Sequence, residues 1–143
     1  MQYKFIVMQT QMAKKSVHYV FIADYNGMNT LFPQIIDCLK ELHNNHISLL
    51  YLHGSEEDVF KNEIATLCKR FPASFIVYRK HIHKQKPEEI QTSLELIINT
   101  NTKHSMQIMV DVSDEYANDI HTQLRFLGIA EKHIELFTTK NHR

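Results

Sequence analysis

The residues most able to bind a ligand are predicted to gather where two buried strands end. Five follow the apolar run Val17–Ala23, one lies near the end of the run Met106–Val112 and one directly follows that run. They are Asp24, Asn26, Gly27, Asn29, Thr30, Asp111 and Ser113. A helix that starts beside such a turn presents unpaired backbone N–H groups, which attract phosphate and other anions. The sequence therefore predicts a weak nucleotide or anion site, with Gly27, Asn29, Thr30 and Ser113 as donors.

A structural interpretation of the same residues competes with ligand binding, and we favour it. Thr30 and Ser113 are typical helix N-caps, and Asp24 can be a solvated loop acid. Four carboxylates would crowd this edge and repel a dianionic ligand: Asp24, Asp111, Asp114 and Glu115.

Metal binding at these acids is the other alternative, because hard cations prefer carboxylates and Asp24 and Asp111 should end neighbouring strands. A phosphate-accepting receiver domain would need a further Asp after the third strand, but that strand is predicted to end at Tyr78–Arg79. His81 and His83 supply at most two ligands, whereas a structural zinc site needs four. We therefore assign no metal ligand.

Catalytic nucleophiles are not evident. Cys38 and Cys68 both fall inside predicted helices, where core packing is the simpler interpretation. The basic run Arg79–Lys86 is predicted to be a solvated loop, since it lacks the interleaved aromatics typical of nucleic-acid binding. No catalytic residue is assigned.

Composition narrows the function classes further. The chain has 143 residues, which suits one domain, and its 16 basic and 16 acidic residues cancel, so nucleic acid is not expected as a partner. No apolar run could span a bilayer, and no signal peptide is recognised, so we expect no membrane association and a cytoplasmic location. Only three glycines are present, too few for a glycine-rich nucleotide loop.

The periodicity predicts five strands that alternate with four helices. The strands are expected at Val17–Ala23, Ile47–Leu52, Ser74–Tyr78, Met106–Val112 and Ile134–Phe137. The helices are expected from Thr30 to His43, from Ser55 to Phe71, from Pro87 to Ile98 and from Ser113 to Gly128. This order predicts a three-layer α/β domain with a five-stranded parallel sheet. It occupies residues 17–143, and residues 1–16 form an N-terminal strand, Tyr3–Gln9, and a linker.

The order of these motifs resembles the NAD(P)-binding module of ferredoxin–NADP reductase-like flavoenzymes. The segment Ile22–Thr30 occupies the place of that family's Ile-Ala-Gly-Gly-Thr-Gly-Ile-Thr-Pro turn. Tyr51–Gly54 is similar to its Tyr-Gly-x-Arg turn, and Glu135–Phe137 to its terminal Glu-x-Phe. The resemblance implies strand order 3-2-1-4-5, NAD(P) as cofactor, and a flavin domain or electron-transfer protein as partner.

Several positions depart from the family pattern. Asp24 and Tyr25 replace two glycines, and the added side chains hinder close approach of a phosphate. Asp111 replaces the family's Cys near the nicotinamide, and Val112-Ser113 replace its Gly-Pro. Gly54 stands where an Arg often lies near the 2′-phosphate. The flavin-binding barrel is also missing, so we expect no flavin to be bound by this chain alone.

Two functions remain open from the sequence. The first is a reductase-like module that binds NAD(P)H and needs a separate flavin domain. The alternative is a degenerate, non-enzymatic module for protein–protein interaction or homodimerisation. Enzymatic activity is left open.

Overall fold

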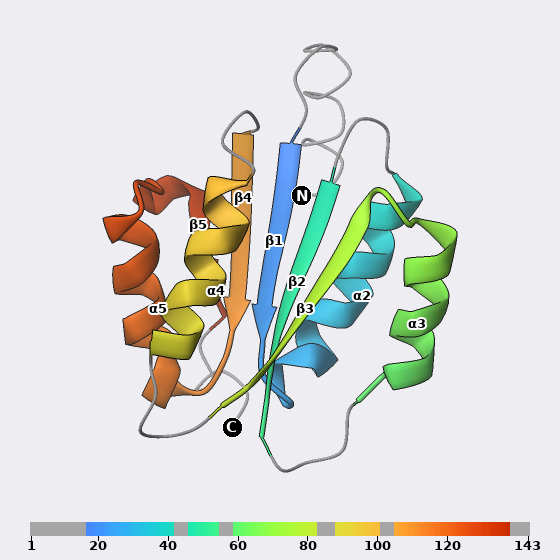
Figure 1. Ribbon diagram of the computed structural model, residues 1–143, viewed down its shortest axis with the longest axis horizontal. Coiled ribbons are helices and arrows are strands. Elements are labelled where there is room, and N and C mark those ends of the chain that lie inside the picture. The colour runs from blue at the N-terminus through green and yellow to red at the C-terminus, as the bar shows by residue number, and fades with distance from the viewer. Residues whose placement is uncertain (1–16, 42–45, 55–58, 83–87, 101–104, 138–143) are drawn as a thin grey trace.

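A five-stranded parallel sheet in the order β3-β2-β1-β4-β5 forms the middle layer of the protein (Figure 1). The computed structural model describes residues 17–41, 46–54, 59–82, 88–100 and 105–137. The strands are β1 (Val17–Ala23), β2 (His46–His53), β3 (Phe75–His81), β4 (Ser105–Asp111) and β5 (Ile134–Leu136). The helices are α2 (Gly27–Lys40), α3 (Lys61–Arg70), α4 (Glu88–Asn99), α5 (Asp114–Phe126) and the 3-10 turn η1 (Glu131–His133). The predicted α/β class and strand order are confirmed.

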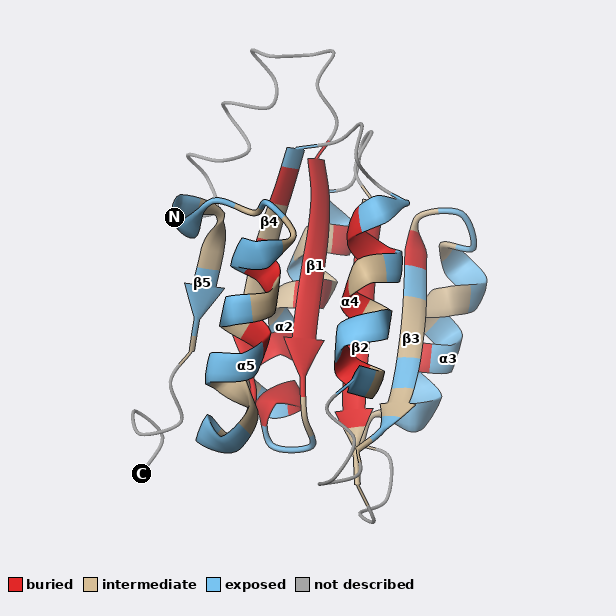
Figure 2. Cartoon of the chain, turned by 60° about the vertical axis from the view of Figure 1, so that its left-hand side comes forward, coloured by how far each residue is buried: buried red, intermediate tan, exposed pale blue. Residues whose placement is uncertain are grey.

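The central strand β1 is buried along its whole length (Figure 2). Alternate side chains serve the two faces, since Phe21 packs into the core shared with α2 and α3, and Val20 and Ile22 pack into the core shared with α4 and α5. A parallel sheet covered on both faces explains why this run of sequence is nearly all apolar.

Helix α2 begins at Gly27, three residues before the predicted start at Thr30. The prediction that Thr30 caps this helix is therefore wrong, and the N-cap position belongs to Asn26, whose side chain makes no capping hydrogen bond. The reason is that Asp24 starts the helix: its carbonyl oxygen accepts the Met28 N–H at 3.1 Å. Thr30 lies inside the helix as a result.

Strand β3 extends to His81, so the prediction that Arg79–His81 belongs to a loop is also wrong. Pairing with β2 continues through Arg79 opposite Tyr51 and His81 opposite His53. The Ile82 N–H then donates to the His53 carbonyl at 2.8 Å. Backbone pairing with a buried neighbour outweighs the polar character of these side chains.

Helix α5 follows the prediction closely. Ser113 occupies its N-cap position, although its side chain makes no capping hydrogen bond, and Gly128 lies just past its end at φ +97°, in the left-handed region that favours glycine. The predicted strand Tyr3–Gln9, the linker in residues 1–16 and the acidic helix start at Ser55–Asp58 lie outside the described residues.

Candidate functional site

The candidate site lies at the carboxyl edge of the sheet, where β1 and β4 end side by side. Ala23 pairs with Asp111 at the last position of both strands. The Asp24 N–H continues this pairing by donating to the Asp111 carbonyl at 3.3 Å. The chain then turns into α2 after β1 and into α5 after β4, so two helix N-termini converge on this point.

The Asp24 carboxylate lies between those two helix N-termini and bonds to both. Its Oδ1 accepts the Gly27 N–H at 2.8 Å, and its Oδ2 accepts the Ser113 N–H at 2.8 Å. Both donors belong to the positive ends of helices, where an anion is stabilised. The side chain of Asp24 therefore takes the backbone donors that the sequence assigned to a bound anion.

Gly27 serves helix packing at this edge. A Cβ built on Gly27 would lie 1.8 Å from the Asp111 carbonyl oxygen and 2.8 Å from its carbonyl carbon. No side chain fits there unless the backbone moves. The glycine lets the first turn of α2 press directly on the end of β4, which accounts for its presence without any ligand.

The structure brings together only some of the predicted site residues. Asp24, Gly27, Asp111 and Ser113 form one contiguous group. Asn29 instead donates its N–H to the Asn26 carbonyl at 3.2 Å, in the first turn of α2.

Negative charge accumulates at this corner. Burial raises the pKa of Tyr116, and the charges of Glu115 and Asp24 and a hydrogen bond to Glu115 raise it further. Asp111 is 2% exposed beside the first turn of α2. A ligand phosphate would meet this field as well as the competing Asp24 carboxylate.

A second group of polar side chains lies at the same edge, where β2 and β3 end. We call it the β2–β3 cluster, made of Tyr51, His53, Arg79 and His81, which the register places on one face of the sheet. The Arg79 guanidinium carbon lies 5.8 Å from the Tyr51 ring centroid. The His53 and His81 rings meet edge to face, with their centroids 5.1 Å apart.

Exposure distinguishes the members of this cluster. Tyr51 is fully buried, and its hydroxyl oxygen accepts the Val59 N–H at 3.4 Å. Arg79 and His81 are exposed. The sequence analysis missed this cluster because it ended β3 at Tyr78. The available signal was the alternation of Phe75, Val77, Arg79 and His81, which continues the strand period.

Metal and thiol chemistry find little support in the parts of the chain that the structure describes. These residues contain no group of three or more His, Cys, Asp or Glu side chains able to hold a metal ion. Burial raises the pKa of Cys38 to about 12, and Asp37 and Glu41 add to the shift, so this thiol stays protonated. Burial also raises the pKa of Cys68.

Within the same described ranges, every helix is too short or too polar to cross a lipid bilayer.

Comparisons with known proteins find matches among solved structures only, since no family profile and no curated protein matches the chain. One match is the ferredoxin–NADP+ reductase from Plasmodium falciparum, with a TM-score of 0.69 and 12% identity, covering 92% of this chain and 54% of that one. Another is the flavohem-like FAD/NAD-binding domain of nitric oxide dioxygenase from Vibrio cholerae O1 biovar El Tor. Its TM-score is 0.62 at 15% identity, covering 84% of this chain and 51% of that domain.

The chain thus spans about half the length of the solved structures that it matches. At these identities the likeness concerns the fold. It agrees with the strand order of the sheet and with the motif order read from the sequence. The protein has the fold of the NAD(P)-binding module of ferredoxin–NADP reductase-like flavoenzymes.

Proposed function

We propose that this protein is a reductase-like module that acts through contacts with another protein domain, and that it does not bind the pyrophosphate of NAD(P)H at the β1–α2 turn. One observation carries the proposal. The two helix N-terminal donors that could receive a phosphate, the Gly27 and Ser113 N–H groups, already bond to the Asp24 carboxylate at 2.8 Å each.

Competition explains why this contact opposes ligand binding. A phosphate would have to displace a carboxylate that is covalently part of the turn and accepts two charge-assisted hydrogen bonds. The displaced Asp24 would stay close to the incoming dianion, and Glu115 would add to the repulsion. Asp24 is part of the chain and loses no translational or rotational entropy of association, whereas a free ligand does.

The partner is proposed from the matched structures. Both names describe flavin or electron-transfer proteins, and this chain spans only about half of each. A separate flavin-binding or electron-transfer domain is therefore the partner class we propose. The electron transfer itself would rest with that partner, since we assign no catalytic residue to this chain.

A second candidate function is NAD(P)H binding as one component of an oxidoreductase, and the β2–β3 cluster favours it. His53 directly precedes Gly54, the position that the resemblance associates with the 2′-phosphate, and β3 places His81 opposite His53 and Arg79 opposite Tyr51. An exposed guanidinium on β3 could replace the missing Arg at position 54 as a phosphate ligand. The nucleotide would then be held at its adenosine end.

Calorimetric titration of the protein separates the two functions. With NADH, NADPH and ADP-ribose at millimolar concentration, the first proposal expects no heat of binding. Micromolar binding of any of the three to the wild-type protein that Arg79→Gln leaves unchanged would contradict it.

The second candidate makes a distinct prediction for the same experiment. It expects NADPH and 2′-AMP to bind more tightly than NADH, and expects this preference to be lost in Arg79→Gln. Lys80→Gln is the matched control, because Lys80 neighbours Arg79 on the opposite face of β3. Equal loss in both variants would indicate nonspecific charge attraction only.

A further inference from the structure

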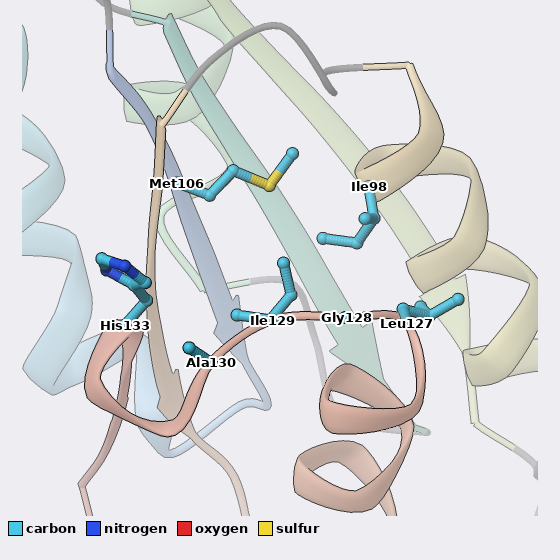
Figure 3. Close-up of a pocket in the computed structure, with 7 residues that line it drawn as sticks. All are labelled: Ile98, Met106, Leu127, Gly128, Ile129, Ala130 and His133. Atoms are coloured by element: carbon cyan, nitrogen blue, oxygen red, sulfur yellow. The ribbon is translucent and has the colours of Figure 1, made fainter.

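A small apolar pocket opens at the amino edge of the sheet, on the side opposite the candidate site (Figure 3). It has a volume of about 280 Å³. Its lining comes from the end of α4, the start of β4 and the connection from α5 to η1: Ile98, Met106, Leu127, Gly128, Ile129, Ala130 and His133. The side chains of Met106, Ile98 and Ile129 point into the same space (Figure 3).

Apolar surface continues beyond the pocket. Phe126, next to the lining residue Leu127, is 78% exposed, the highest value among the large exposed hydrophobic residues that the structure describes. The His133 Nδ1 lies 3.0 Å from the Gln107 amide nitrogen, so the polar atom at the pocket wall already has a protein partner. We call the pocket lining and the exposed Phe126, which precedes the lining residue Leu127 in the chain, the apolar patch, because water solvates such surface poorly.

The chain itself supplies an apolar segment at this place. Sixteen residues precede Val17, and Val17 pairs with Ser105, the residue before Met106. Eight mostly polar residues, 9–16, connect Met8 to Val17 and reach at most about 28 Å. Ahead of them, the segment Tyr3–Met8 carries five apolar side chains among six residues.

We propose that Tyr3–Met8 packs into this pocket and against Phe126. The segment has the required length, joins the sheet beside the pocket and matches it in polarity. Burial of the segment would remove the apolar patch from water. This inference does not depend on the function proposed above, because the pocket lies at the other edge of the sheet.

A double-variant cycle in the full-length protein tests the contact. We expect Phe5→Ala and Ile129→Ala each to raise the equilibrium constant of unfolding about tenfold, as partial loss of a buried apolar contact does. Because both variants break the same contact, the double variant should show about the same tenfold effect, not a hundredfold one. Urea titration followed by circular dichroism gives the three constants.

Ile76→Ala is the matched control, since Ile76 is a 41% exposed isoleucine on β3, away from the pocket. Its effect should add to that of Phe5→Ala. Additive effects of Phe5→Ala and Ile129→Ala would overturn the proposal.

Two further readouts cover variants that fold poorly and a different occupant. With methyl-labelled methionine, the Met106 signal should shift in Phe5→Ala, and an unchanged Met106 signal would count against the contact. Sedimentation should detect no wild-type dimer of the kind that the Phe126→Asp substitution would dissociate. Such a dimer would mean that a second copy covers the patch and would overturn the proposal.

Discussion

The two halves of the carboxyl edge have opposite chemistry. At the ends of β1 and β4, an acidic side chain, Asp24, occupies two helix N-termini and a glycine is packed against a backbone carbonyl. At the ends of β2 and β3, the β2–β3 cluster presents Arg79 and His81 to solvent. In one half the Asp24 carboxylate occupies the backbone donors, and in the other half basic side chains are exposed.

The difference shows how the β1–α2 turn is stabilised by the chain's own carboxylate. The bonds from Gly27 and Ser113 to Asp24 hold β1, α2 and α5 together in the way that a bound anion could. The turn therefore contributes stability without a ligand. Arg79 and His81 of the β2–β3 cluster are exposed, which is why nucleotide binding remains the second candidate there.

The largest expected effect tests whether Gly27 serves packing. Gly27→Ala should reduce the free energy of unfolding by about 3 kcal/mol or more, because its Cβ would lie 1.8 Å from the Asp111 carbonyl oxygen. Urea unfolding followed by circular dichroism measures the loss. Gly128→Ala is the control: it strains a positive φ but meets open space, and should cost only about 1 kcal/mol. A smaller loss for Gly27→Ala than for Gly128→Ala would contradict the packing role.

The next largest effect tests whether the hydrogen bonds from Gly27 and Ser113 to the Asp24 carboxylate stabilise the fold. Asp24→Asn should cost about 2 kcal/mol in unfolding free energy, since an amide offers one acceptor oxygen where two partly buried N–H groups need a partner. Asp119→Asn, at an exposed position of α5, provides the comparison for removal of a charge. If the two variants cost the same, the Asp24 bonds contribute nothing to stability, and the contrast between the two halves fails.

Arg79→Gln should have a small effect on stability, below about 1 kcal/mol, because it removes an exposed guanidinium from the Tyr51 ring. The same urea titration, with Lys80→Gln alongside, measures it. A loss as large as that of Asp24→Asn would show that the basic half is also a structural feature, and would weaken the case for a ligand there.

The smallest effect concerns Glu131, a carboxylate away from this edge. The hydrogen bond and charge of His121, followed by those of Arg125, lower the pKa of Glu131. A lowered folded pKa contributes stability above the unfolded value, and this contribution is lost as pH falls through the folded value. Glu131→Gln should therefore flatten the acid limb of the stability curve slightly between about pH 5 and 3. Glu135→Gln removes an exposed carboxylate that does not contact His121 or Arg125 in the interactions that the structure describes, and should leave the acid limb unchanged. If it flattens the acid limb as much as Glu131→Gln does, the contacts of Glu131 with His121 and Arg125 are not the cause.

Local patterns in the sequence were sufficient for much of the fold. The apolar run Val17–Ala23 indicated a doubly covered central strand, and Ser113 and Gly128 marked the two ends of α5. The strand order came from the family resemblance, and the structure confirms it. The buried strand and the ends of α5 depend on neighbouring residues, so the sequence displays them directly, whereas the strand order does not.

The site depended on contacts between distant residues. The Asp24 carboxylate meets the N–H of Ser113, 89 positions away, and nothing in the local sequence of either residue indicates that bond. The start of α2 at Gly27 has a local cause, since the Asp24 carbonyl accepts the Met28 N–H and completes the first turn. Strand β3 continued through Arg79 since pairing with β2 decides its length.

The central claim is that Asp24 occupies the anion position of the β1–α2 turn. Calorimetric titration of Asp24→Gly with ADP-ribose and inorganic pyrophosphate, beside the wild-type protein, tests it most directly. We predict no binding to the wild type at millimolar ligand and measurable binding to the folded variant, whose Gly27 and Ser113 N–H groups are released. Tight binding to the wild type, or no gain in a variant whose circular dichroism shows it folded, would contradict the claim.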